Sequence, residues 1–118
     1  MQWLLHGSLT PDVTDSLVKH EHKTHATSEL DLPPDATAAD VLAACQKKQW
    51  DILTSDVAMS RIPFTAHHRF TRCIVYLQEP GPKAVDRLFD RYKRLSPGRL
   101  YTVTASRVKI RQLPTEIR

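Results

Sequence analysis

Short apolar runs recur along this chain, separated by polar or amphipathic segments. The runs at residues 2–5 and 73–77, and the pair Ile52-Leu53 within residues 51–54, are too brief for helices. The run at 73–77 is rich in β-branched residues, so each of the three predicts a strand. Residues 22–28 are weakly patterned and are interpreted as a further short strand. The tail, residues 100–113, alternates between apolar and polar positions as strands do. The pattern therefore predicts several short strands distributed over the whole length.

Three segments between these runs carry apolar residues at helical spacing. They predict helices from residue 11 to about 20, from 38 to about 48 and from 85 to about 95. The first two begin with typical helix-start sequences, Thr-Pro-Asp and Thr-Ala-Ala-Asp. The polar stretch 57–72 predicts a loop. Strands that alternate with helices favour an α/β fold with a mainly parallel central sheet flanked by helices, and a C-terminal strand or hairpin.

This topology predicts where functional residues gather. In open parallel sheets, ligands bind beyond the carboxyl ends of the strands. His6 follows the first strand, Asp56 follows the strand 51–54, and a loop follows Leu77. We expect these positions to lie at one edge of the sheet.

Composition indicates a single soluble domain spanning residues 1–118. Hydrophobic residues make up 41% and charged residues 25% of the chain, which is ordinary for a globular protein. No apolar run is long enough to span a membrane, and residues 1–5 do not resemble a signal peptide, so we expect a cytoplasmic protein. Cys45 and Cys73 lie in apolar segments, and we interpret them as buried free thiols.

Charge divides the chain into two unlike halves. Residues 1–59 hold four basic and nine acidic residues, and residues 60–118 hold thirteen basic and four acidic ones. The acidic half could supply metal ligands and the basic half could hold phosphate. A fold with differently solvated faces explains the same asymmetry.

Three stretches, in order, resemble small bacterial PIN-like domains. The start, MQWLLHGSLTPDVTDSL, is similar to M-x-x-L-L-D-x-x-L-x-P followed by a helix. The middle, DATAADVLAACQKKQWDILTSD, resembles S-D-x-x-I-L-x-x-A, a spacer, and L-V-T-x-D-x-D-F. The ending, SPGRLYTVTASRVKIRQLP, is similar to tails of this branch. The resemblance implies a three-layer PIN-like fold and descent from Mg²⁺- or Mn²⁺-dependent ribonucleases, many of which are toxins of toxin–antitoxin pairs.

Relative to that pattern, the acidic positions are largely replaced. The first acid of the family falls at His6, the second at Ala38, and the last at Ala58, so Asp56 alone keeps its place. Phosphodiester cleavage by hard cations needs several converging carboxylates. Imidazole suits Zn²⁺, Mn²⁺ or Ni²⁺ better than Mg²⁺.

Asp40 is the first candidate to compensate for the missing acids. It lies two residues beyond Ala38 and is interpreted either as a substitute ligand or as the third residue of a capping box. The candidate catalytic residues are therefore Asp56, His6 and Asp40, and the candidate ligands for Mg²⁺ or Mn²⁺ are Asp56 and Asp40. Asp56 itself is also a good turn residue after a strand.

Basic side chains crowd the stretch between Asp56 and the strand at 73–77. They are candidates for contact with RNA phosphates and comprise Arg61, His67, His68, Arg69 and Arg72. In the tail, Arg107, Lys109 and Arg111 point to one side of a strand that follows a turn near 105–106. This row of basic side chains could hold an RNA backbone or protect an edge strand from self-pairing.

Three functions remain compatible with the sequence. The first is a PIN-like protein whose nuclease site has decayed and which still binds RNA or a protein partner such as an antitoxin. The second is an active Mg²⁺- or Mn²⁺-dependent endoribonuclease toxin that uses Asp56 with substitute ligands. The third is a structural or regulatory module, for instance a homodimer, that involves no nucleic acid.

Overall fold

A computed structural model describes residues 1–65, 69–79 and 81–114. Six strands form one sheet: β1 Gln2–His6, β2 Lys23–His25, β3 Asp51–Thr54, β4 Ile74–Leu77, β5 Arg99–Val103 and β6 Val108–Gln112. Four α-helices and one 3₁₀ turn connect them: α1 Asp12–Lys19, η1 Thr27–Leu30, α2 Ala38–Lys48, α3 Val57–Thr65 and α4 Pro82–Arg91. Within the described residues, no helix is long and apolar enough to cross a membrane.

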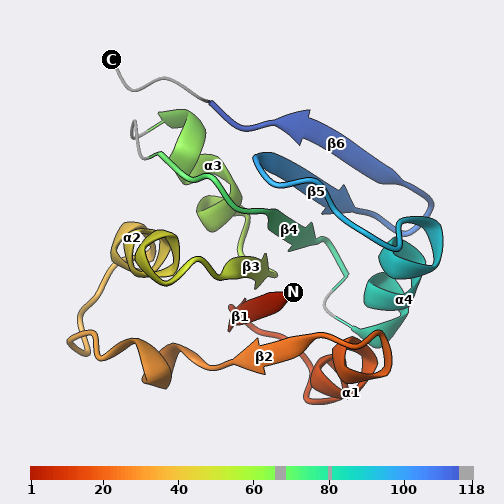
Figure 1. The fold of residues 1–118 in the computed structure, drawn as a ribbon, viewed down its shortest axis with the longest axis horizontal. Helices are drawn as coiled ribbons and strands as arrows, with labels where there is room; N and C mark the ends of the chain where they lie inside the picture. The colour runs from red at the N-terminus through yellow and green to blue at the C-terminus, as the bar shows by residue number, and fades with distance from the viewer. Residues whose placement is uncertain (66–68, 80, 115–118) are drawn as a thin grey trace.

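The sheet has the order β2-β1-β3-β4-β5-β6 (Figure 1). The first five strands are parallel, and β6 pairs antiparallel with β5. The expected α/β fold with a mainly parallel sheet and a C-terminal hairpin is therefore confirmed.

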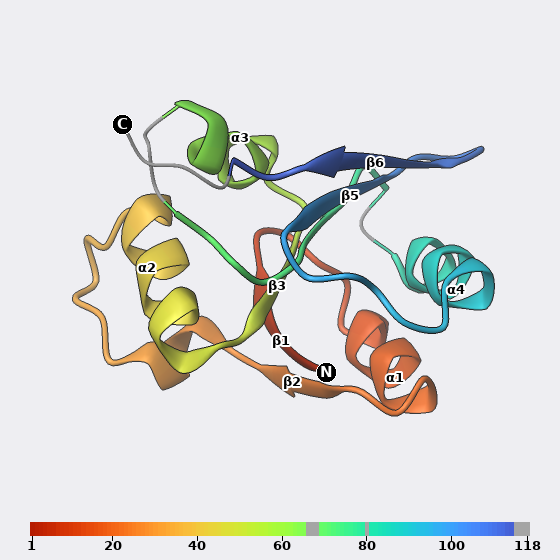
Figure 2. The same ribbon diagram turned by 45° about the horizontal axis from the view of Figure 1, so that its top comes forward.

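Two helices cover each face of the sheet, giving three layers (Figure 2). α1 packs against α4 on one face, and α2 packs against α3 on the other. Residues along each strand alternate between these two layers, as the two-residue period of a strand requires. In β1, for example, Trp3 joins the core beneath α1 and α4, while Leu4 joins the core beneath α2 and α3.

Local sequence explains the expected helices well, with one misplaced residue. Thr37 Oγ1 accepts from the amide of Asp40, and Asp40 Oδ2 accepts from the amide of Thr37, so the capping box at the start of α2 is confirmed. α1 buries Val13 and Leu17 as its periodicity predicts. Helical spacing also led us to expect Val18 on this apolar face, and that expectation is wrong, because its side chain is 59% exposed.

The stretch 57–65 is helical, whereas we expected a loop. Pro63 inside α3 argues against a helix because it has no amide hydrogen to donate. Two features offset that loss. Asp56 Oδ1 accepts from the amide of Ala58 at the helix start, and Met59 and Pro63, four residues apart, are both buried.

α4 ends earlier than its periodicity predicts. The helix stops at Arg91, and Tyr92 is extended, with φ −125°. The Tyr92 ring contacts that of Tyr101 edge-on, and Leu95 is buried although it lies beyond the helix. Tyr92 and Leu95, which we expected in the helix, thus pack against the rest of the protein from the segment that follows it.

Candidate functional site

The carboxyl ends of β1 and β3 lie at the point where the strand connections of this sheet change direction. After β1 the chain enters α1 on one face, and after the neighbouring β3 it enters α3 on the opposite face. Adjacent strands whose connections leave on opposite faces open a crevice between them, and α/β proteins commonly bind ligands there. His6 and Asp56 both lie at this point, as the sequence predicts.

Gly7 allows the two loops to approach each other. Its φ is +86°, and a Cβ atom at this position would lie 2.5 Å from Ser55 Oγ and 3.3 Å from the amide nitrogen of Asp56. A side chain would therefore collide with the loop after β3 and would also strain the backbone. The glycine is required by this contact between the two strand ends.

Thr54 connects the two predicted site residues. Its hydroxyl Oγ1 is fully buried, lies 2.8 Å from His6 Nδ1 and accepts from the amide of Asp56 at 2.9 Å. Burial lowers the pKa of His6 below its ordinary value, and the negative charge of Asp56 opposes that shift only in part. The imidazole is therefore neutral at pH 7.

Asp56 has a structural task at this edge. Its Oδ1 accepts from the amide of Ala58 at 2.9 Å, which satisfies one of the free amide groups at the start of α3. Asp40 is likewise engaged, in the capping box of α2. Both carboxylates predicted as metal ligands therefore serve as helix caps.

These donors do not fit a hard cation. Mg²⁺ prefers a near-octahedral set of oxygen ligands that includes carboxylates, whereas this edge offers a neutral imidazole and a carboxylate that caps a helix. Glu29, a further acidic side chain near β2, bonds to His25 at 3.0 Å and to the amide of Ala26. Among the residues that the structure describes, no three His, Cys, Asp or Glu side chains gather as a metal would require.

A cavity opens beside His6. It has a volume of about 460 Å³, and His6, Gly7, Thr27 and Ser28 line it together with apolar residues of the segment 32–41. Its polar groups are an imidazole and hydroxyls, which suit hydrogen bonding to a neutral or anionic ligand rather than cation binding. Asp56 does not line this cavity.

The predicted RNA-contacting residues divide between two places. Arg61 is exposed on α3, and Arg69 is exposed near the start of β4. Arg72 lies at the amino edge of the sheet, opposite to the edge that holds Asp56, and its Nη2 donates to the fully buried Asp51 at 3.1 Å. His67 and His68 lie outside the described residues.

A second basic group comes from β6. Lys109 and Arg111 are exposed and alternate with Val108 and Ile110 along this edge strand. The guanidinium of Arg111 lies over the ring of Phe64, with 3.9 Å from Cζ to the ring centroid. This contact joins β6 to α3, so Arg111 and, two positions away on the same strand face, Lys109 lie on the α3 side of the sheet. Arg107 precedes β6.

Sequence reasoning missed three residues that organise these sites: Gly7, Thr54 and Asp51. A glycine at the end of a predicted strand indicates a positive φ or a close approach, which is the signal for Gly7. Thr54 and Asp51 carry no such signal, because their importance comes from burial and from partners distant in the sequence.

No family model, no curated protein and no solved structure matches this chain.

Proposed function

We propose that this chain is a PIN-like protein of toxin–antitoxin ribonuclease descent whose metal-nuclease site has decayed, and that it binds RNA without cleaving it. The observation that carries the proposal is the use of Asp56 as a helix cap beside a neutral His6. The family motif that the sequence resembles calls for carboxylates that converge on a cation. Here the retained acid stabilises α3 instead.

RNA binding is assigned to the surface shared by α3 and β6. Arg61 and Phe64 lie three residues apart on α3 and are neighbours on the helix surface. Arg111 covers Phe64, and Lys109 follows two positions away on the same side of β6. A cation over an aromatic ring, with further exposed cations on the same surface, suits the backbone and bases of a single strand.

RNA affinity is the first measurement that tests this proposal. Fluorescence anisotropy with a labelled single-stranded RNA should show binding that weakens as salt rises, because each phosphate contact releases counterions. The double variant Arg61→Gln/Lys109→Gln should weaken binding and reduce the salt slope by about 2. The matched control is Lys83→Gln/Arg91→Gln on α4, which removes the same charge from exposed positions on the opposite face. Equal losses in both variants would mean that net charge, and not this surface, determines affinity.

RNA cleavage is the second measurement. Incubation with RNA and Mg²⁺ or Mn²⁺ should give no cleavage above a no-protein control. Cleavage that requires metal and disappears in Asp56→Asn would contradict the proposal and support the active endoribonuclease, since Asn keeps the helix cap but loses the charge.

A further inference from the structure

A basic hollow lies at the amino edge of the sheet, away from both surfaces described above. It has a volume of about 330 Å³, and its lining includes Arg72, Lys93 and Arg94. These cations come from the start of β4 and from the segment after α4. Glu21 is the one carboxylate among the lining residues, so the three cationic side chains outnumber it.

Arg72 is fixed in position by a buried partner. Asp51 is fully buried, accepts from Arg72 Nη2 at 3.1 Å and also accepts from the amide of Cys73 at 2.8 Å. Arg72 Nε is buried and has no hydrogen-bond partner among the described residues. The ion pair thus uses one donor of the guanidinium, and the same side chain lines the hollow.

The other two cationic side chains of the hollow are Lys93 and Arg94. Among the described residues, no ion pair involves Lys93 or Arg94, and both side chains are exposed. By contrast, the nearby Lys19 is paired with Asp86 at 3.0 Å. Lys93 and Arg94 are therefore available to neutralise a bound anion.

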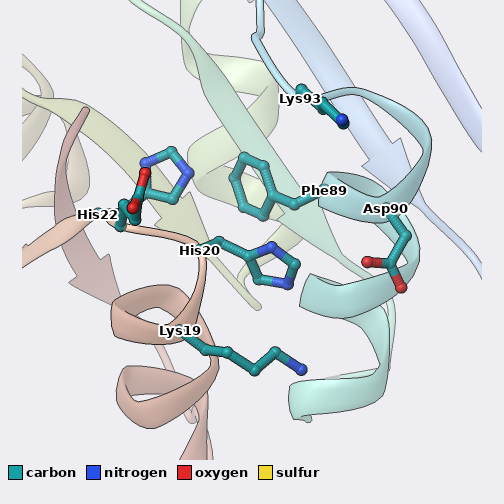
Figure 3. A pocket seen from close by; sticks show the side chains of 7 residues that line it. Lys19, His20, His22, Phe89, Asp90 and Lys93 are labelled. Atoms are coloured by element: carbon teal, nitrogen blue, oxygen red, sulfur yellow. The ribbon is translucent and has the colours of Figure 1, made fainter.

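His22 adds an uncharged donor to the same wall. Its Nδ1 accepts from Trp3 Nε1 at 3.2 Å, so the proton of the neutral ring lies on Nε2. The ring of His22 packs against Phe89, with 4.4 Å between centroids, and His20 packs on Phe89 as well (Figure 3). These contacts hold the ring in one orientation.

A second hollow of about 370 Å³ adjoins the first. The two share His20, Glu21, His22 and Lys93 as lining residues, and Phe89 lines the second one (Figure 3). A ligand held by its charged group near Arg72 and Lys93 therefore has room beside it for an organic part.

We propose that this hollow is a binding site for a small phosphate monoester, with the phosphate held by Arg72, Lys93 and Arg94 and the organic part extending toward His20 and Phe89. Arginine and lysine bind phosphate oxygens by charge-assisted hydrogen bonds, and an anchored guanidinium offers them at a fixed angle. The inference does not rest on the proposed RNA binding, which uses the α3 and β6 surface.

Calorimetric titration tests the site with three probes: adenosine 5′-monophosphate, inorganic phosphate and adenosine. The monophosphate should bind at a single site, and adenosine should not bind. Inorganic phosphate should bind more weakly than the monophosphate. Equal or tighter binding of inorganic phosphate would overturn the monoester and assign the hollow to free phosphate. Absence of heat with both phosphate compounds would overturn the site altogether.

Variants then locate the binding. Lys93→Gln/Arg94→Gln changes only exposed side chains and should raise the dissociation constant by about tenfold or more. Glu21→Gln should lower it, because it removes the carboxylate that opposes the anion. The control Lys83→Gln/Arg91→Gln removes the same charge elsewhere and should leave affinity unchanged. Equal effects of the control and the Lys93/Arg94 variant, or no tightening by Glu21→Gln, would contradict the assignment.

Discussion

Asp51 and Arg72 form an ion pair whose acidic partner is fully buried, at the amino edge of the sheet. Asp51 Oδ1 also accepts the amide of Cys73, so this one carboxylate connects the start of β3 to the start of β4. Immediately after this connection along the chain, the two strands begin to pair in parallel, with Ile52 beside Ile74. Arg72 therefore has a structural partner in addition to any ligand it binds.

Asp51→Ala should destabilise the protein. It leaves the Arg72 guanidinium and the Cys73 amide without their acceptor, and loss of one partner of a buried pair typically costs several kcal/mol. Because Arg72 is 30% exposed and water can replace part of the interaction, we expect about 2 kcal/mol. Urea unfolding measures the change. Asp40→Ala, which removes an exposed capping carboxylate, is the comparison and should cost about 1 kcal/mol.

Gly7→Ala should destabilise the fold by about 2 kcal/mol or more, because a Cβ there meets Ser55 Oγ and the backbone has a positive φ. Gly81→Ala is the matched control: a Cβ atom at that position meets nothing within 4 Å, and its φ of −142° is open to any residue. Thermal unfolding of the two variants makes the comparison. Equal melting temperatures would mean that the loops after β1 and β3 separate without cost.

Much of the fold could be predicted because its signals are local. The strand at 73–77 is apolar, the strand at 51–54 has Ile52 and Leu53 at its centre, and the capping box at the start of α2 can be read from the four residues 37–40. α3 could not be predicted in this way. Its proline argues against a helix, and the burial of Met59 that offsets the proline depends on α2 and the sheet.

The candidate site was predictable in place but not in detail. Topology located His6 and Asp56 at the same edge, since both follow neighbouring parallel strands. Their actual bonds depend on Thr54, a residue that sequence alone marks only as the end of a strand. The location of Arg72 could not be predicted. Its nearness in sequence to Arg69 suggested a shared RNA surface, whereas its partner Asp51 lies 21 residues away in the sequence.

Stability should fall as pH drops from 6.5 toward 4. Burial, with the positive charges of the Met1 amino group and His20, lowers the pKa of His22 from 6.5 to about 4. In this window the unfolded chain binds a proton at His22 that the folded chain does not, so the contribution is full above pH 6.5 and is lost as pH falls. The loss should reach up to about 3 kcal/mol, and the lowered pKa of His6 acts in the same direction.

Urea unfolding at pH 7.5 and pH 5 measures this effect, and NMR titration of the His22 ring assigns it. His22→Asn should flatten the pH dependence between these values, whereas His25→Asn, at a histidine that bonds to Glu29 and Gln2, should retain it. The pKa of Asp86, at about 2, lies below the window, so that carboxylate does not contribute to the change. An unfolding free energy independent of pH in this range would contradict the burial of a neutral His22.

Substitutions at Asp56 distinguish a helix cap from a metal ligand. Asp56→Asn keeps an oxygen that can accept from the amide of Ala58, so stability should change by only a few tenths of a kcal/mol. Asp56→Ala removes that acceptor and should cost about 1 kcal/mol. Addition of Mg²⁺ or Mn²⁺ should leave the melting temperature of the wild type unchanged, because a ligand stabilises only the state it binds. A metal-dependent rise in melting temperature that Asp56→Asn abolishes would instead show that the carboxylate turns from the helix to a cation, and the nuclease interpretation would then replace the proposed loss of activity.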